Sequence, residues 1–152
     1  MAFHPGIQNI NELVATQAFN SSVVPVDVTG FSTAIAAGKS LYWEVNAVFS
    51  TGATGGFRFL AHSTSAPTTY NAVFHIIDIT TAAPAGTPYN TAQVAEAAFT
   101  NASAVATNYS LEAWGKVTAN LLTTFSFQFA QNNSTVNNIS MLAGATMTTW
   151  LL

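Results

Sequence analysis

The stretch Leu41-Tyr42-Trp43-Glu44-Val45-Asn46-Ala47-Val48-Phe49 places an apolar residue at every second position. Successive side chains of a strand point to opposite faces, so this spacing predicts a strand with one buried face. Residues 125–130, Phe-Ser-Phe-Gln-Phe-Ala, repeat the pattern with three phenylalanines on one side. One apolar and one polar face are typical of an antiparallel sheet that is wet on one side. We therefore expect both segments to supply the core of an antiparallel β protein.

Similar short segments recur along the chain, separated by turns that are rich in Gly, Pro and Asn. Further strands are predicted at 23–28, 31–36, 57–61, 70–80, 96–105, 111–118, 135–142 and 145–152. This number and spacing of short strands predicts an all-β, antiparallel sandwich or jelly roll. The residues that share the inward faces are expected to be buried: Trp43, Val45, Phe49, Phe57, Phe59, Phe74, Ile76, Phe125, Phe127 and Phe129.

Residues 1–22 precede the β domain, which is expected to span 23–152. Apolar and Pro residues are frequent in this segment, although a free tail is usually poor in them. We expect an N-terminal arm that becomes ordered against a sister subunit or a capsid surface. Two alternatives are an extra edge strand on the chain's own sheet and a short helix over 9–19. The anchoring residues of such an arm would be Phe3, Pro5, Ile7, Ile10, Leu13 and Phe19.

Charge is scarce: three basic and six acidic residues make up 6% of the 152 residues, against roughly 25% in an ordinary soluble domain. Nucleic-acid binding needs clustered Lys and Arg, and the few basic residues are dispersed. No segment reaches the roughly 18 consecutive apolar residues of a membrane span. A surface with so few charges is expected to be covered by other protein. We therefore predict a homo-oligomer with neither nucleic-acid nor membrane partners.

The segment 70–80 is apolar on both faces, notably at Val-Phe-His-Ile-Ile. An antiparallel strand with one wet face should alternate, so its outer face is predicted to be covered. Symmetry mates would explain both this feature and the missing charges, whereas a local loop is the alternative. The outward residues His75, Ile77 and Ile79 are the predicted subunit interface.

No motif for catalysis is present. The histidines His4, His62 and His75 lack metal-ligand spacing, the acids are single, and there is no cysteine. No nucleophile elbow occurs, and the glycines of 52–56 lack the Lys-Ser/Thr of a phosphate loop. We expect no enzyme activity, no metal and no cofactor. A sugar-stacking platform is an alternative use of the aromatic residues, which are Tyr42, Trp43, Tyr70, Tyr89, Tyr109, Trp114 and Trp150.

Two cassettes carry a family resemblance. Residues 26–32, Val-Asp-Val-Thr-Gly-Phe-Ser, and 36–44, Ala-Ala-Gly-Lys-Ser-Leu-Tyr-Trp-Glu, open the domain. Residues 127–132, Phe-Gln-Phe-Ala-Gln-Asn, and 140–145, Ser-Met-Leu-Ala-Gly-Ala, close it. Their order and spacing resemble those of small jelly-roll structural proteins of tailed bacteriophages. The resemblance implies that residues 23–152 form an antiparallel jelly-roll sandwich. Such a module, often trimeric, occurs in decoration, cement, fibre or tail-tip proteins.

Together these observations predict a virion protein that is assembled in the host cytoplasm. The favoured role is a trimeric capsid decoration or cement protein that binds between major capsid subunits, because the chain lacks the repetitive or coiled-coil stalk of fibre proteins. The alternative is a tail-fibre or tail-tip module that binds a receptor on the host.

Overall fold

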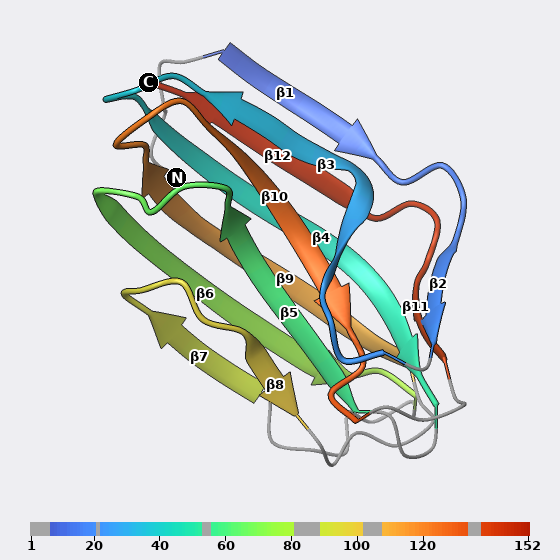
Figure 1. Ribbon diagram of the computed structural model, residues 1–152. Coiled ribbons are helices and arrows are strands. Elements are labelled where there is room, and N and C mark those ends of the chain that lie inside the picture. The colour runs from blue at the N-terminus through green and yellow to red at the C-terminus, as the bar shows by residue number, and fades with distance from the viewer. Residues whose placement is uncertain (1–6, 21, 53–55, 81–88, 102–107, 134–137) are drawn as a thin grey trace.

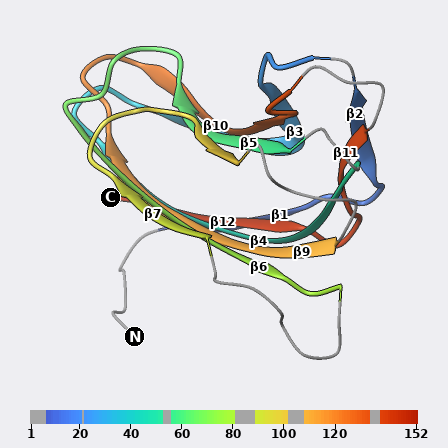
Figure 2. The same cartoon turned by 90° about the horizontal axis from the view of Figure 1, so that it is seen from below.

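The computed structural model describes residues 7–20, 22–52, 56–80, 89–101, 108–133 and 138–152. All regular elements in these ranges are strands, and they form two antiparallel sheets packed face to face (Figures 1 and 2). The strands are β1 (Ile7–Glu12), β2 (Gln17–Asn20), β3 (Val26–Ile35), β4 (Ser40–Thr51), β5 (Phe57–Ser63), β6 (Thr69–Asp78), β7 (Tyr89–Gln93), β8 (Phe99–Asn101), β9 (Asn108–Thr118), β10 (Thr123–Ala130), β11 (Asn138–Met141) and β12 (Thr146–Leu151).

The order of the strands identifies the fold. The large sheet runs β1-β12-β4-β9-β6-β7, with β11 pairing β4 and β2, and the small sheet runs β3-β10-β5-β8. Early strands pair with late ones in nested fashion: β1 with β12, β3 with β10, β4 with β9 and β5 with β8. This wrapped pairing is a jelly roll, as the sequence predicts. The strands β6 and β7 lie between β5 and β8 in the chain and widen the large sheet beyond β9.

The core lies between the two sheets and is aromatic. All ten residues predicted to be buried are at most 1% exposed. Trp43 of the large sheet lies 5.3 Å from Phe125 and 6.0 Å from Phe127, centroid to centroid. Phe49 packs edge-on against Phe59 at 4.8 Å. The apolar faces of β4 and β10 thus pack against each other in one core, as the alternation of their residues predicts.

The glycines of the two sequence cassettes have structural roles. Gly30 (φ +81°) lies inside β3 where the pairing with β10 shifts register, so the two segments predicted at 23–28 and 31–36 form one bulged strand. Gly38 (φ +76°) and Gly144 (φ +87°) lie in turns, and their N–H groups donate to Ala119 and Leu13. A positive φ favours glycine, which has no Cβ to clash with the backbone. The cassettes therefore encode the turns of the fold.

The N-terminal segment differs from the expected separate arm. The strands β1 and β2 pair with β12 and β11 along the edge of the large sheet. Leu13 between them is 3% exposed and exchanges backbone hydrogen bonds with the turn at 144–145, and the ring of Phe19 lies 6.3 Å from that of Phe129. Residues 7–20 are thus part of the sandwich, as in the edge-strand alternative, and are not helical. Pairing satisfies backbone groups of β11 and β12 that would otherwise lie unpaired.

Strands at the other edge also differ from the sequence prediction. The strand expected at 96–105 is β8, which covers only Phe99–Asn101, and residues 102–107 lie outside the described residues. The strand β7 was not anticipated, because its segment Tyr89–Gln93 has no regular apolar alternation. Pairing with β6 holds it in the sheet, so tertiary context decides its conformation.

One end of the sandwich gathers four connections and the C-terminus (Figure 1). The turn at 36–39 contacts the turn at 119–122 through Gly38 N–H and Ala119 O at 2.8 Å. Leu152 N–H donates to Ser40 O at 2.9 Å, and the loop at 64–68 is held by Thr68 N–H, which donates to Thr118 O at 2.8 Å. The connection between β7 and β8 lies at the same end. We call this the turn end.

Candidate interaction surfaces

The described residues contain no group of three or more His, Asp or Glu side chains that could hold a metal ion. They also contain no helix long and apolar enough to span a membrane. The remaining candidate surfaces are the polar network of the small sheet, the turn end and the outer face of the large sheet.

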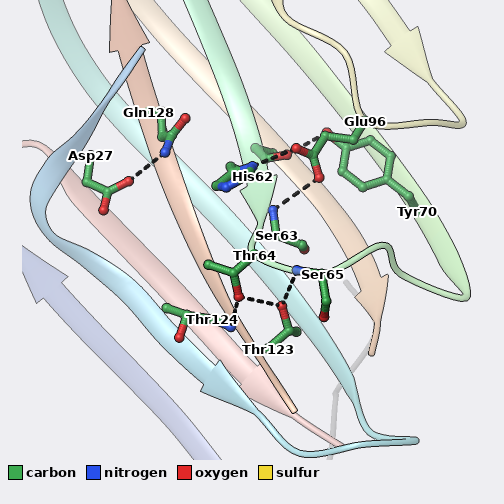
Figure 3. A network of polar contacts seen from close by, with 11 residues as sticks. Asp27, His62, Ser63, Thr64, Ser65, Tyr70, Glu96, Thr123, Thr124 and Gln128 are labelled. Atoms are coloured by element: carbon green, nitrogen blue, oxygen red, sulfur yellow. Dashed lines mark hydrogen bonds and ion pairs between the residues drawn. The ribbon is translucent and has the colours of Figure 1, made fainter. Parts of the chain in front are cut away.

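Glu96 is the centre of the polar network in Figure 3. Its Oε1 lies 2.6 Å from His62 Nδ1, and its Oε2 accepts the backbone N–H of Ser63 at 3.1 Å. Nearby, the Tyr70 hydroxyl donates to Ala61 O at 3.0 Å. Burial raises the pKa of Tyr70 above its ordinary value, and the Glu96 carboxylate adds to the rise. Both carboxylate oxygens are engaged, so Glu96 fastens the β7–β8 connection to β5.

Hydroxyl groups continue this network toward the turn end (Figure 3). Thr64 and Thr123 share a hydrogen bond of 3.1 Å between their hydroxyls, and Thr123 Oγ1 also accepts Ser65 N–H at 3.1 Å. Thr124 N–H donates to Thr64 Oγ1 at 3.0 Å. A hollow of about 690 Å³ lies between the β5–β6 loop at 64–68 and residues 94–96. The bonds hold the β5–β6 loop against the start of β10, which is a structural role.

The turn end exposes apolar side chains. Leu121 and Leu122 occupy the tip of the β9–β10 connection and are 62% and 75% exposed. Such positions usually carry Gly, Asn, Asp, Ser or Pro. Val94 and Leu152 are also exposed there, at 89% and 39%. We call Leu121 and Leu122 the apolar tip.

The predicted interface residues share the outer face of the large sheet. His75 and Ile77 are half-buried on β6, and Ile79 just beyond it is 43% exposed. His75 Nδ1 lies 3.4 Å from Glu112 Oε2 on the neighbouring strand β9. The structure therefore brings the three residues to one surface. Coverage of this surface by a sister subunit stays a prediction.

The arm residues are separated by the fold. Leu13 is buried and Phe19 is partly buried against the core, whereas Ile10 is 64% exposed on the outer face of β1. Ile7 begins β1 opposite Leu151. Phe3 and Pro5 lie outside the described residues. The anchoring role of this segment stays a prediction.

The aromatic residues divide into two groups. Trp43, Tyr70 and Tyr109 are at most 7% exposed and belong to the core, and the side chain of Tyr89 is outside the described part. The other three lie on adjacent strands and alternate with buried neighbours, so they point to the outer face of the large sheet. We call Tyr42, Trp114 and Trp150 the aromatic face.

Register defines the layout of the aromatic face. Trp150 on β12 pairs with Tyr42 on β4, and Tyr42 pairs with Lys116 on β9. The Lys116 ammonium lies 5.3 Å from the centroid of the Tyr42 ring. In the neighbouring row Trp114, which is 43% exposed, pairs with Glu44. Three aromatic side chains, a lysine and a carboxylate thus adjoin on three strands.

Both surfaces carry signals that the sequence interpretation missed. Two leucines follow Ala119-Asn120 in a connection too short for a strand of its own. The inward alternation through Leu111, Ala113 and Val117 assigns Trp114 to the outer face. The grouping of Trp114 with Tyr42 and Trp150 depends on the pairing of β9, β4 and β12, which are distant in sequence.

No protein-family model matches the sequence, and no curated protein matches it. Among solved structures, a family two carbohydrate esterase from Cellvibrio japonicus has a TM-score of 0.29 and 8% identity over 91% of this chain and 36% of that chain. The VP2 subviral particle of infectious bursal disease virus has a TM-score of 0.25 and 14% identity over 97% of this chain and 42% of that chain. The Gx strain of that virus has a TM-score of 0.23 and 9% identity, with coverage of 97% and 40%. The chain spans less than half the length of each, and no functional conclusion follows from similarities of this size.

Proposed function

We propose that this chain is a structural protein of a bacteriophage virion, namely a non-catalytic capsid decoration or cement protein. It would act as a homotrimer that binds between major capsid subunits and thereby stabilises the head. The observation that carries the proposal is the apolar tip on a chain with only 6% charged residues. The jelly-roll fold and the sequence resemblance to phage structural proteins support it.

The exposed leucines give the tip its binding capacity. Full burial of a leucine side chain contributes about 1.5–3 kcal/mol. Leu121 and Leu122 are already partly covered, so docking them would contribute about 2–4 kcal/mol per subunit. In a trimer three such contacts act together, and their avidity exceeds that of one contact. Weak tips on a symmetric oligomer would thus suffice for stable attachment to a shell.

The tip can be tested by binding to capsids that lack this protein. The double variant Leu121→Ser/Leu122→Ser should bind at least about tenfold more weakly in co-sedimentation, because each removed contact contributes more than 1 kcal/mol. The matched control is Val14→Ser, since Val14 is 87% exposed but lies in the connection between β1 and β2. If the unmodified chain, the double leucine variant and Val14→Ser bind equally well, the role of the tip is refuted.

Two measurements address the rest of the proposal. Sedimentation velocity at micromolar concentration should give a trimer, and a stable monomer at all concentrations would refute this oligomeric state. The copy number in purified virions should be comparable to that of the major capsid protein. A far smaller number would favour the alternative role in the tail.

A further inference from the structure

We infer that the aromatic face of the large sheet binds a neutral glycan, an activity that goes beyond the proposed capsid attachment. The starting point is Trp114, which is 43% exposed in the middle of β9, with β4 on one side and β6 on the other. Its cross-strand partners are Glu44 and Val73. An indole at the centre of a sheet usually contributes to a core or to a binding surface, and this one faces away from the core.

The carboxylates around Trp114 can accept further hydrogen bonds. Glu44 Oε1 accepts from Asn46 Nδ2 at 2.9 Å, and its Oε2 has no partner among the described residues. The Glu112 side chain is 58% exposed, and its one described contact is with His75 at 3.4 Å. Carboxylate oxygens are strong acceptors for hydroxyl donors. Trp114 is therefore flanked by groups that suit the hydroxyls of a sugar, while its ring suits the apolar C–H face of a pyranose.

These carboxylates disfavour a protein as the occupant of the area over Trp114. The subunit contact predicted at Ile77 and Ile79 would lie at the end of β6, beyond Glu112 as seen from Trp114. A protein partner would have to desolvate Glu44 and Glu112, which is costly unless each meets a cation. A second copy of this chain could offer few, because its sequence has three Lys and Arg residues. Lys39 lies in the turn at 36–39, and Arg58 lies on the small sheet, where it donates to Val23 O at 2.8 Å. Lys116 already lies over the Tyr42 ring.

The charge of the same surface favours a neutral glycan over an acidic one. Glu12 pairs with Thr146 on the outer face, so three carboxylates, Glu12, Glu44 and Glu112, share it with Lys116. An anionic polysaccharide would be repelled by this excess of negative charge. A neutral glycan is not repelled by this charge, and its hydroxyls can donate hydrogen bonds to the carboxylates. The site thus combines one exposed ring with a few polar groups that fix orientation, as small-ligand sites do.

The experiment uses the full chain on a glycan array that carries neutral and acidic oligosaccharides of the common pyranoses, followed by titration of a neutral hit monitored by tryptophan fluorescence. Trp114→Ala should weaken binding by about tenfold or more, as truncation of a central aromatic anchor does. Trp114→Phe should retain part of the affinity because it keeps an aromatic ring. Circular dichroism and sedimentation should be unchanged in both variants, because Trp114 is outside the core.

A matched control separates this inference from the proposed function. Leu121→Ser/Leu122→Ser alters the apolar tip at the turn end and should leave glycan binding unchanged, while Trp114→Ala should leave capsid binding unchanged. Absence of any neutral glycan that binds would overturn the inference. Preferential binding of acidic glycans, equal binding by Trp114→Ala, or a change in oligomeric state caused by that variant would also overturn it. The last result would assign the aromatic face to contacts between copies of this chain.

Discussion

Replacement of Gly115 by alanine should destabilise the fold strongly, although only one methyl group is added. Gly115 lies in β9 and pairs with Trp43 on β4 and with Ala72 on β6. A Cβ at this position would lie 2.1 Å from the backbone oxygen of Asn71 and 2.8 Å from Cζ2 of Trp43. Neither distance is compatible with van der Waals contact, so part of the structure has to move.

The size of the effect follows from what can move. Overpacking a well-filled core costs about 1–3 kcal/mol and occasionally more. Here the closest atom belongs to the backbone of β6, which is held in the ladder with β9. The indole of Trp43 is 1% exposed and is packed against Phe125 and Phe127, so it cannot swing away. We therefore expect a loss of about 3 kcal/mol or more in the free energy of unfolding.

Urea unfolding at a fixed protein concentration, followed by circular dichroism, measures this loss. With a slope of about 1–3 kcal/mol per molar urea, the midpoint should fall by at least about 1 M. The control is Gly38→Ala, where no described atom lies within 4 Å of the added Cβ and only the φ of +76° is unfavourable. That conformation costs a residue with a side chain about 1–2 kcal/mol. Surface substitutions without structural consequence change the free energy of unfolding by about 0.5 kcal/mol or less. A change of Gly115→Ala within about this range would refute the packing argument.

Three further predictions concern the core, the alkaline limit and the sheet edge. Phe127→Asp should abolish folding, because Phe127 is fully buried between Trp43 and Phe59 and the carboxylate would be desolvated; a soluble variant with native circular dichroism would contradict the register of β10. The melting temperature should fall as pH rises above about 10, the ordinary pKa of tyrosine, since the raised pKa of Tyr70 keeps the folded state protonated while the unfolded state loses its proton. Tyr70→Phe should flatten this decline in thermal scans, and an unchanged decline would assign it elsewhere. Deletion of residues 1–17 should lower the melting temperature because it removes β1 from β12 and buried Leu13; an equally stable truncation would show that the edge strand is dispensable.

Strand alternation made the core predictable. Each of the strands β4, β5 and β10 places its large apolar residues at every second position, and burial of one face follows from the pleat. The turn glycines Gly38 and Gly144 were equally readable, since local chain geometry determines what these positions tolerate. The number and spacing of such strands predicted a sandwich or a jelly roll, and the resemblance to phage structural proteins favoured the jelly roll.

The N-terminal segment was harder, because its residues are compatible with an arm, an edge strand or a short helix. Only the free edges of β11 and β12 select the extended conformation that β1 and β2 adopt. The segment of β7 likewise carries no clear period and takes its form from β6. Pairing energy between distant segments decided these elements, and a single sequence does not display it.

The sequence by itself determined an all-β sandwich with an aromatic core and few charges, because these properties follow from local alternation and composition. Only the tertiary structure decided which exposed residues lie on the same end or face of the sandwich. Leu121 and Leu122 lie at the same end as Val94 and Leu152 because four connections and the C-terminus lie there. Tyr42, Trp114 and Trp150 share a face because β4 lies between β9 and β12. The physical reason is that binding surfaces are built from long-range strand pairing, whereas the core requires only the two-residue period of each strand.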